Sequence, residues 1–123
     1  KVDQAFMQLT SPKGALFQQL LQHHEFEQME FIIAIRNGID DEDGIWHDDG
    51  SRLMAFSLSL MSHPESIRGG NLSIRHKGSN ETIEISPQPF GTLLIFLTGE
   101  YGFEHKVNQV LAGERVVIAG WCS

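Results

Sequence analysis

Residues 71–86 read NLSIRHKGSNETIEIS, and this stretch decides the fold class because it has the pattern of a β-hairpin. Its two halves, 71–78 and 81–86, alternate apolar and polar side chains on either side of a GSN turn. Further short apolar runs lie outward from it: EFIIAIR (30–36), LMAFSLSLM (53–61), TLLIFLT (92–98) and RVVIAGW (115–121). Short strands at spacings of roughly ten residues, without helices between them, predict an antiparallel β-sandwich or jelly roll.

A helix is expected ahead of these strands, at SPKGALFQQLLQHH (11–24). Ser11 suits the N-cap and Pro12 the first helical position, and apolar residues follow with helical spacing: Leu16, Phe17, Leu20 and Leu21. A chain of 123 residues is long enough for one core and too short for two. We therefore expect a single domain over 1–123, with helical N-terminal support over 1–26 and a jelly-roll core over 27–123.

The composition excludes several classes of protein. The net charge is −7, and the nine basic residues are scattered, which argues against a nucleic-acid-binding surface. No apolar run approaches the roughly 18 residues that a membrane span requires. The first ten residues lack the apolar segment of a signal peptide, and Cys122 is the only cysteine, so a cytoplasmic location is expected.

The stretch GIWHDDGSR (44–52) contains a candidate metal site. If it is a strand, His47 and Asp49 point to the same side, because side chains alternate. The acidic surroundings allow other readings, namely a solvated loop, a mobile lid, or a surface that attracts a basic substrate. Two histidines and one carboxylate on one face are the ligands of non-haem Fe(II) oxygenases, and His105 is the best candidate for the third ligand.

The C-terminal stretch HKVNQVLAGERVVIAGW (105–121) resembles a family signature. It is similar to the end of the prolyl-4-hydroxylase-like branch of the Fe(II)/2-oxoglutarate-dependent dioxygenases. That signature has a distal histidine, a V-x-x-G-x-(R/K) turn and a late tryptophan, matched here by Val110, Gly113, Arg115 and Trp121. IRGGNLSI (67–74) and PFGTLLIF (89–96) resemble strands of the same family, so the resemblance spans roughly 30–121.

This resemblance implies a double-stranded β-helix in which His47, Asp49 and His105 bind Fe(II). It implies that Asp48 points away and that Arg115 holds the distal carboxylate of 2-oxoglutarate. The remaining candidates for the co-substrate pocket are Ser57, Ser59 and Trp121. The implied reaction uses O₂ to hydroxylate a C–H bond of a prolyl residue, an amino acid or another small substrate, and releases succinate and CO₂.

Some residues depart from the family pattern, and some roles stay open. A tyrosine common before H-x-D is absent, and Arg36 and Asn37 lie near its place, while the only tyrosine is Tyr101. Ser57 and Ser59 share one face of a strand, which contacts either the co-substrate or solvent. Trp46 is expected to pack in the core, and Trp121 is expected either to line the pocket or to pack beneath the last strand.

Two other functions compete with the oxygenase. A cupin-like jelly roll would bind a metal without 2-oxoglutarate, but such proteins usually carry a His-x-His pair, which this sequence lacks. A non-catalytic β-sandwich interaction module would carry its histidines incidentally. The sequence leaves the oligomeric state and the choice between a peptide and a small-molecule substrate undetermined.

Overall fold

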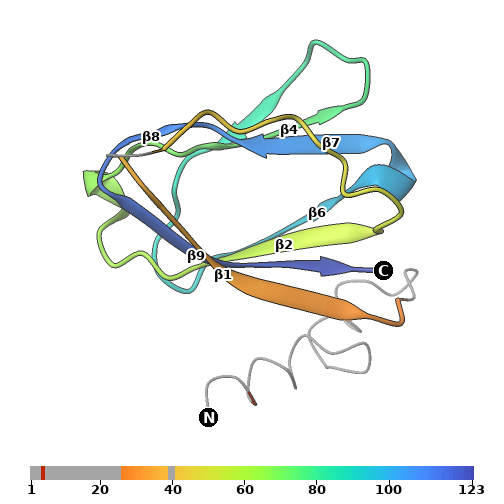
Figure 1. Ribbon diagram of the computed structural model, residues 1–123, viewed down its shortest axis with the longest axis horizontal. Coiled ribbons are helices and arrows are strands. Elements are labelled where there is room, and N and C mark those ends of the chain that lie inside the picture. Colours follow the sequence, from red (N-terminus) through yellow and green to blue (C-terminus); the bar gives the residue numbers. More distant parts are fainter. Residues whose placement is uncertain (1–3, 5–25, 39–40) are drawn as a thin grey trace.

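Two facing layers of β-strands form the fold, and the computed structural model describes residues 4, 26–38 and 41–123 (Figure 1). The helix expected over 11–24 lies outside these residues, as does most of the helical support expected over 1–26. No helix in the described part of the chain is long and apolar enough to span a bilayer.

The larger sheet is antiparallel and has the strand order β1–β9–β2–β6. Its strands are β1 (Met29–Asn37), β9 (Glu114–Cys122), β2 (Met54–Ser59) and β6 (Leu93–Leu97). These segments are rich in valine, isoleucine, leucine and phenylalanine, which fit a pleated, half-buried surface. Strand β9 pairs with β1 on one side and with β2 on the other, so it is central to the sheet.

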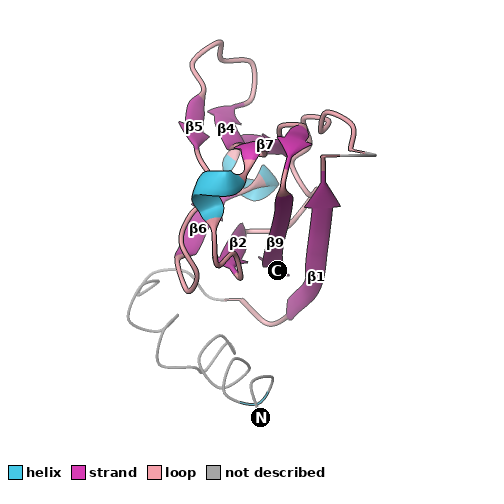
Figure 2. Cartoon of the chain, turned by 90° about the vertical axis from the view of Figure 1, so that its left-hand side faces the viewer, coloured by secondary structure: helices cyan, strands magenta, loops and turns pink. Residues whose placement is uncertain are grey.

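The opposite layer contains a three-stranded sheet, β5–β4–β7, and a short pair, β3–β8 (Figure 2). Their bounds are β5 (Ile83–Ile85), β4 (Leu72–His76), β7 (Phe103–Val107), β3 (Arg68–Gly69) and β8 (Val110–Ala112). Strands β4 and β5 form the expected hairpin, in which Leu72 lies opposite Ile85. Two 3₁₀ turns, η1 (Pro64–Ser66) and η2 (Gly99–Tyr101), connect strands.

Alternation along the larger sheet gives its two faces different roles. One face carries the buried apolar cluster, which consists of Phe26, Met54, Phe56, Ile118 and Cys122. Gly120 is needed there because a Cβ at this position would overlap the Phe56 ring. The other face carries small side chains, among them Ala55, Ser57 and Ala119, beside larger apolar ones such as Phe96 and Val117, and it faces the smaller sheet across a cavity.

All six segments expected to be strands form strands, with boundary shifts of a few residues, and the mainly β fold is confirmed. Strands β3, β7 and β8 were not expected. Strand β7 reads FEHKV and mixes charged with apolar residues, while β3 and β8 are only two and three residues long. Such segments give too weak a periodic signal, and their pairing depends on strands that are distant in sequence.

Candidate metal centre and adjoining cavity

Two histidines from distant parts of the chain meet beside β7. His105 lies in the middle of β7 and pairs with Ile74 of β4, and on its other side it forms an isolated antiparallel bridge with His47. The His47 N–H donates to the His105 carbonyl over 3.0 Å, and the His105 N–H donates to the His47 carbonyl over 2.8 Å. Because the two backbones are joined here, the ring centroids lie 4.3 Å apart.

Asp49 joins the two histidines, but not in the way the sequence suggested. The expectation that His47 and Asp49 lie on one regular strand is wrong, because the chain forms only a single bridge at His47. Asp49 has a φ of 59°, in the left-handed region that aspartate tolerates better than most residues, and a turn through Gly50 follows. This local reversal, rather than strand alternation, positions the Asp49 carboxylate beside the histidines.

The three side chains form a compact cluster of potential ligands. Asp49 Oδ1 lies 3.5 Å from His47 Nε2, and Asp49 Oδ2 lies 3.3 Å from His105 Nε2. One ligand atom from each residue lies within 4.8 Å of the others. Within the described part of the chain, Asp49 Oδ2 and His105 Nδ1 are buried without a hydrogen-bond partner. A buried carboxylate oxygen without a partner is costly, and a cation at the centre of the cluster would remove that cost.

Hydrogen bonding and burial at the two histidines suit metal binding. His47 Nδ1 lies 2.7 Å from the Ile45 carbonyl oxygen, so Nδ1 donates there and Nε2 is directed toward Asp49. Burial lowers the pKa of His105 to about 4, against the opposing attraction of Asp49, so this imidazole is neutral at neutral pH. Two imidazoles and one carboxylate are a ligand set that fits Fe(II).

Asp48 points away from the cluster, as the resemblance implied. Its Oδ2 pairs with Lys77 Nζ at 2.6 Å, and its Oδ1 accepts the Gly50 N–H at 2.9 Å. The hydrogen bond from Lys77 lowers the pKa of Asp48, so this carboxylate remains ionised. The residue between the two ligands therefore fastens the turn to the β4–β5 hairpin.

A cavity of about 230 Å³ adjoins the cluster. Both His47 and His105 line it, together with Arg115 of β9. The other lining side chains are mostly apolar and come from both sheets, including Ile32, Ala34, Ala55, Leu72, Phe96, Val107, Val117 and Ala119. Such a mostly apolar pocket with a few convergent polar groups is typical of a small-molecule site.

Arg115 is the buried cation of this cavity. It is only 6% exposed, and its Nε has no hydrogen-bond partner among the described residues. Burial lowers its pKa to about 10, with a smaller contribution from the nearby charge of Arg36, so it stays cationic at neutral pH. A buried guanidinium with an unsatisfied donor fits a carboxylate-bearing ligand, which accepts charge-assisted hydrogen bonds.

The remaining candidates for the co-substrate pocket differ in their surroundings. Ser57 is buried and lines the cavity opposite Ala119 of β9, whereas Ser59 donates to the Gln88 carbonyl oxygen at 2.7 Å. Neither serine faces solvent. Ser59 lines only a smaller recess that Ser57 and Arg115 also border. Trp121 lines the cavity, with the Arg52 guanidinium 5.0 Å from its ring centroid.

Two residues have surroundings that the sequence did not indicate. Arg36 lines the cavity and is the cross-strand partner of Arg115, but hydrogen bonds to Asp41, Val107 and Glu42 engage its guanidinium. The expectation that Trp46 packs in the core is wrong. Trp46 is half-buried outside the core cluster, and the Arg75 guanidinium lies 3.9 Å from its ring centroid.

Comparisons with known proteins agree with this geometry. A PKHD-type hydroxylase from Hyphomonas neptunium is 37% identical over 68 residues, which are 55% of this chain and 27% of that protein. A PKHD-type hydroxylase from Prochlorococcus marinus is 33% identical over 95 residues, covering 73% of this chain and 40% of that protein. The chain thus spans less than half the length of these curated relatives.

The fold also matches solved structures. A prolyl-4-hydroxylase from Pseudomonas putida superposes with a TM-score of 0.63 at 24% identity, covering 85% of this chain and 56% of that one. The family model described as the 2OG-Fe(II) oxygenase superfamily matches residues 15–123. The expected jelly roll is therefore confirmed, and this chain belongs to the 2OG-Fe(II) oxygenase superfamily.

Proposed function

We propose that this chain is the catalytic core of an Fe(II)- and 2-oxoglutarate-dependent hydroxylase that acts on a C–H bond of a peptide or small-molecule substrate. The superfamily uses Fe(II), 2-oxoglutarate and O₂. One observation carries the proposal. The converging ligand atoms of His47, Asp49 and His105 lie beside the same cavity that contains the buried cation Arg115.

In this proposal His47, Asp49 and His105 bind the iron through two imidazole nitrogens and one carboxylate oxygen. When bound, the iron with 2-oxoglutarate and O₂ supplies the oxidising chemistry of hydroxylation, with succinate and CO₂ as by-products. The protein's own task is to fix the three ligands on one side of the metal, leaving the other side open. The proton on His47 Nδ1, donated to the Ile45 carbonyl, keeps Nε2 directed toward the metal position.

Arg115 is proposed to receive the distal carboxylate of 2-oxoglutarate. Its guanidinium can donate two parallel hydrogen bonds to a carboxylate, and its burial excludes competing water. Ser57 contributes a hydroxyl to the lining of the same cavity, and we assign Ser57 a hydrogen bond to the bound 2-oxoglutarate. Ser59 is held by its hydrogen bond to the Gln88 carbonyl and supports the strand that carries Ser57. Trp121 is part of the apolar lining of the cavity.

The substrate is proposed to approach from the side of His47. The His47 side chain is 51% exposed, whereas the side chains of Asp49 and His105 are each 8% exposed. The half-exposed ligand marks the accessible side of the cluster. The net charge of −7 argues against a nucleic-acid substrate, and the unpaired, buried Cys122 fits a cytoplasmic location.

The competing functions have less support in the site. A non-catalytic interaction module gains nothing from a buried arginine whose Nε lacks a hydrogen bond, or from a buried Asp49 oxygen that also lacks one, and both are costly. A cupin-like metal site gives Arg115 no role. Both alternatives predict that 2-oxoglutarate does not bind.

A turnover screen tests the proposal. We expect the wild-type protein, given Fe(II), 2-oxoglutarate and O₂, to hydroxylate at least one member of a panel of proline-containing peptides and free amino acids. Mass spectrometry detects the added oxygen, and enzymatic assay of succinate shows equal amounts of both products. A His105→Ala protein serves as the inactive control. Hydroxylation that proceeds equally without 2-oxoglutarate would show that 2-oxoglutarate is not the co-substrate.

A further inference from the structure

The acidic segment before the metal cluster is fastened to the rest of the protein. Asp41 pairs with Arg36, Asp43 with Lys106 and Asp48 with Lys77, at distances of 2.6 to 3.0 Å. These three carboxylates are therefore already paired, and they offer less free acidic surface to a basic substrate than the sequence suggested. Their negative charges are neutralised by ion pairs with Arg36, Lys106 and Lys77.

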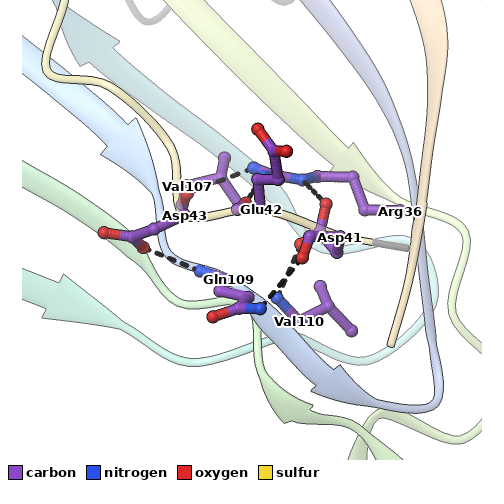
Figure 3. Close-up of polar contacts among 7 residues, drawn as sticks. All are labelled: Arg36, Asp41, Glu42, Asp43, Val107, Gln109 and Val110. Atoms are coloured by element: carbon purple, nitrogen blue, oxygen red, sulfur yellow. Dashed lines mark hydrogen bonds and ion pairs between the residues drawn. The ribbon is translucent and has the colours of Figure 1, made fainter. Parts of the chain in front are cut away.

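Asp41 lies at the centre of these contacts (Figure 3). Its Oδ1 accepts a hydrogen bond from Arg36 Nε at 2.8 Å, and its Oδ2 accepts the Val110 N–H at 2.7 Å. Its carbonyl oxygen accepts a hydrogen bond from Gln109 Nε2 at 2.9 Å. Arg36 in turn donates through Nη1 to the Val107 carbonyl at 3.1 Å. The Asp41 carboxylate thus joins the acidic segment to strand β1 and to the first residue of β8, and the Asp41 carbonyl joins it to the β7–β8 connection.

Neighbouring contacts extend the same attachment toward the metal cluster. Asp43 Oδ1 accepts the Gln109 N–H at 2.9 Å, and the Gly44 N–H donates to the Val107 carbonyl at 3.0 Å. The next contact along the chain is the His47–His105 bridge. We call the Arg36, Asp41, Asp43, Gln109 and Val110 contacts the clasp. It holds residues 41–47 alongside β7, which carries His105.

This arrangement has an energetic consequence for metal binding. His47 and Asp49 lie on a segment with almost no regular strand pairing, so their position relative to His105 depends on local attachments. A ligand set that is assembled before the metal arrives avoids an ordering cost on binding. Removing the attachment should therefore loosen the bridge and weaken metal binding together.

We propose that Asp41 is a positioning residue for the metal centre, whose carboxylate holds the segment bearing His47 and Asp49 against the strand bearing His105. The inference rests on the proposed function where it concerns iron. The assembly of the ligands itself is a property of the metal-free protein and is measurable without iron.

The test compares the wild-type protein with Asp41→Asn and Glu42→Gln. An asparagine cannot accept hydrogen bonds from both Arg36 Nε and the Val110 N–H through two oxygens. Glu42→Gln is the matched control, because Glu42 is the exposed neighbour and contributes its carbonyl, not its carboxylate, to Arg36. Amide hydrogen exchange of the metal-free proteins is measured at His47 and His105, with Phe56 and Ile118 as core references.

We expect exchange at His47 and His105 to accelerate by roughly tenfold in Asp41→Asn, while the core references and the control variant keep wild-type rates. Anaerobic calorimetry with Fe(II) alone should show a dissociation constant raised by roughly tenfold, the lower end of the loss for groups that support metal ligands. Unchanged exchange at both histidines would overturn the proposal. An equal acceleration at the core references would also overturn it, since that indicates general destabilisation.

A second variant covers the case in which Asp41→Asn does not fold. Asp43→Ala removes the acceptor for the Gln109 N–H and the partner of Lys106 from the same clasp. We expect a smaller acceleration of the same two amides, and wild-type rates in this folded variant would overturn the proposal. If wild-type protein binds no Fe(II), the proposed function fails, while the exchange experiment still decides the role of Asp41.

Discussion

Replacing His105 with alanine is expected to raise the dissociation constant for Fe(II) at least about 100-fold, more than the loss typical of supporting groups. In the proposed site His105 supplies one of three ligands, and its ring lies next to the backbone bridge to His47 and makes an edge contact with Phe96. Anaerobic calorimetry with Fe(II) measures the change directly. The change should not come from unfolding, because the strand hydrogen bonds of residue 105 involve only its backbone.

His63→Ala is the matched control for this variant. His63 is highly exposed and lies near only Glu65, at 3.4 Å, so its loss should leave the Fe(II) affinity unchanged. Far-ultraviolet circular dichroism and thermal unfolding establish that both variants fold. A folded His105→Ala protein with wild-type Fe(II) affinity would exclude this residue as a ligand.

Replacing Arg115 with methionine is expected to weaken 2-oxoglutarate binding by at least about 100-fold, since a hydrogen bond to a charged group contributes about 1.5–3 kcal/mol and a bidentate pair has two, about 3–6 kcal/mol together. The Fe(II) affinity should stay at the wild-type level, because Arg115 lies outside the ligand cluster. Calorimetric titration of the Fe(II)-loaded protein with 2-oxoglutarate, without O₂, separates the two affinities. Arg115→Lys should lose part of the affinity, because an ammonium lacks the planar two-donor geometry.

The Arg115→Met variant also has an expected effect on stability. Burial of a guanidinium whose Nε lacks a partner is costly, and methionine fills a similar volume without charge. The metal-free variant should therefore unfold at the same temperature as the wild-type protein or at a higher one. Arg68→Met, at an exposed arginine, provides the control for loss of one positive charge. Wild-type affinity for 2-oxoglutarate in Arg115→Met would remove this residue from the co-substrate site.

The strands that were predictable from the sequence are those with a strong local pattern. Strands β6 and β9 are apolar runs, and this local composition alone predicts a buried strand. Their observed boundaries therefore differ only slightly from the predicted ones. The alternation of Ser57 and Ser59 against Phe56 and Leu58 correctly put the two serines on one face of the strand, but it left open whether that face contacts the co-substrate or solvent. Strand β7 depends instead on pairing with β4, which a single sequence does not display.

The candidate metal ligands were predictable by type but not by geometry. His47, Asp49 and His105 come together as the family pattern implied. The local reason differs, because Asp49 reaches the histidines through a left-handed turn and not through strand alternation. The clasp at Asp41 was not predictable, since its partners Arg36 and Val110 come from other segments and carry no motif. A run of aspartates looks the same in sequence whether it is solvated or paired.

An anaerobic titration of the metal-free wild-type protein with Fe(II) and 2-oxoglutarate, followed by visible absorption, tests the central claim most directly. A weak charge-transfer band should appear only when both components are present, because the co-substrate must bind to iron held by His47, Asp49 and His105. The band should be absent in His105→Ala and should require far more 2-oxoglutarate in Arg115→Met. Iron that binds normally to the wild-type protein without any band at saturating 2-oxoglutarate would contradict the account.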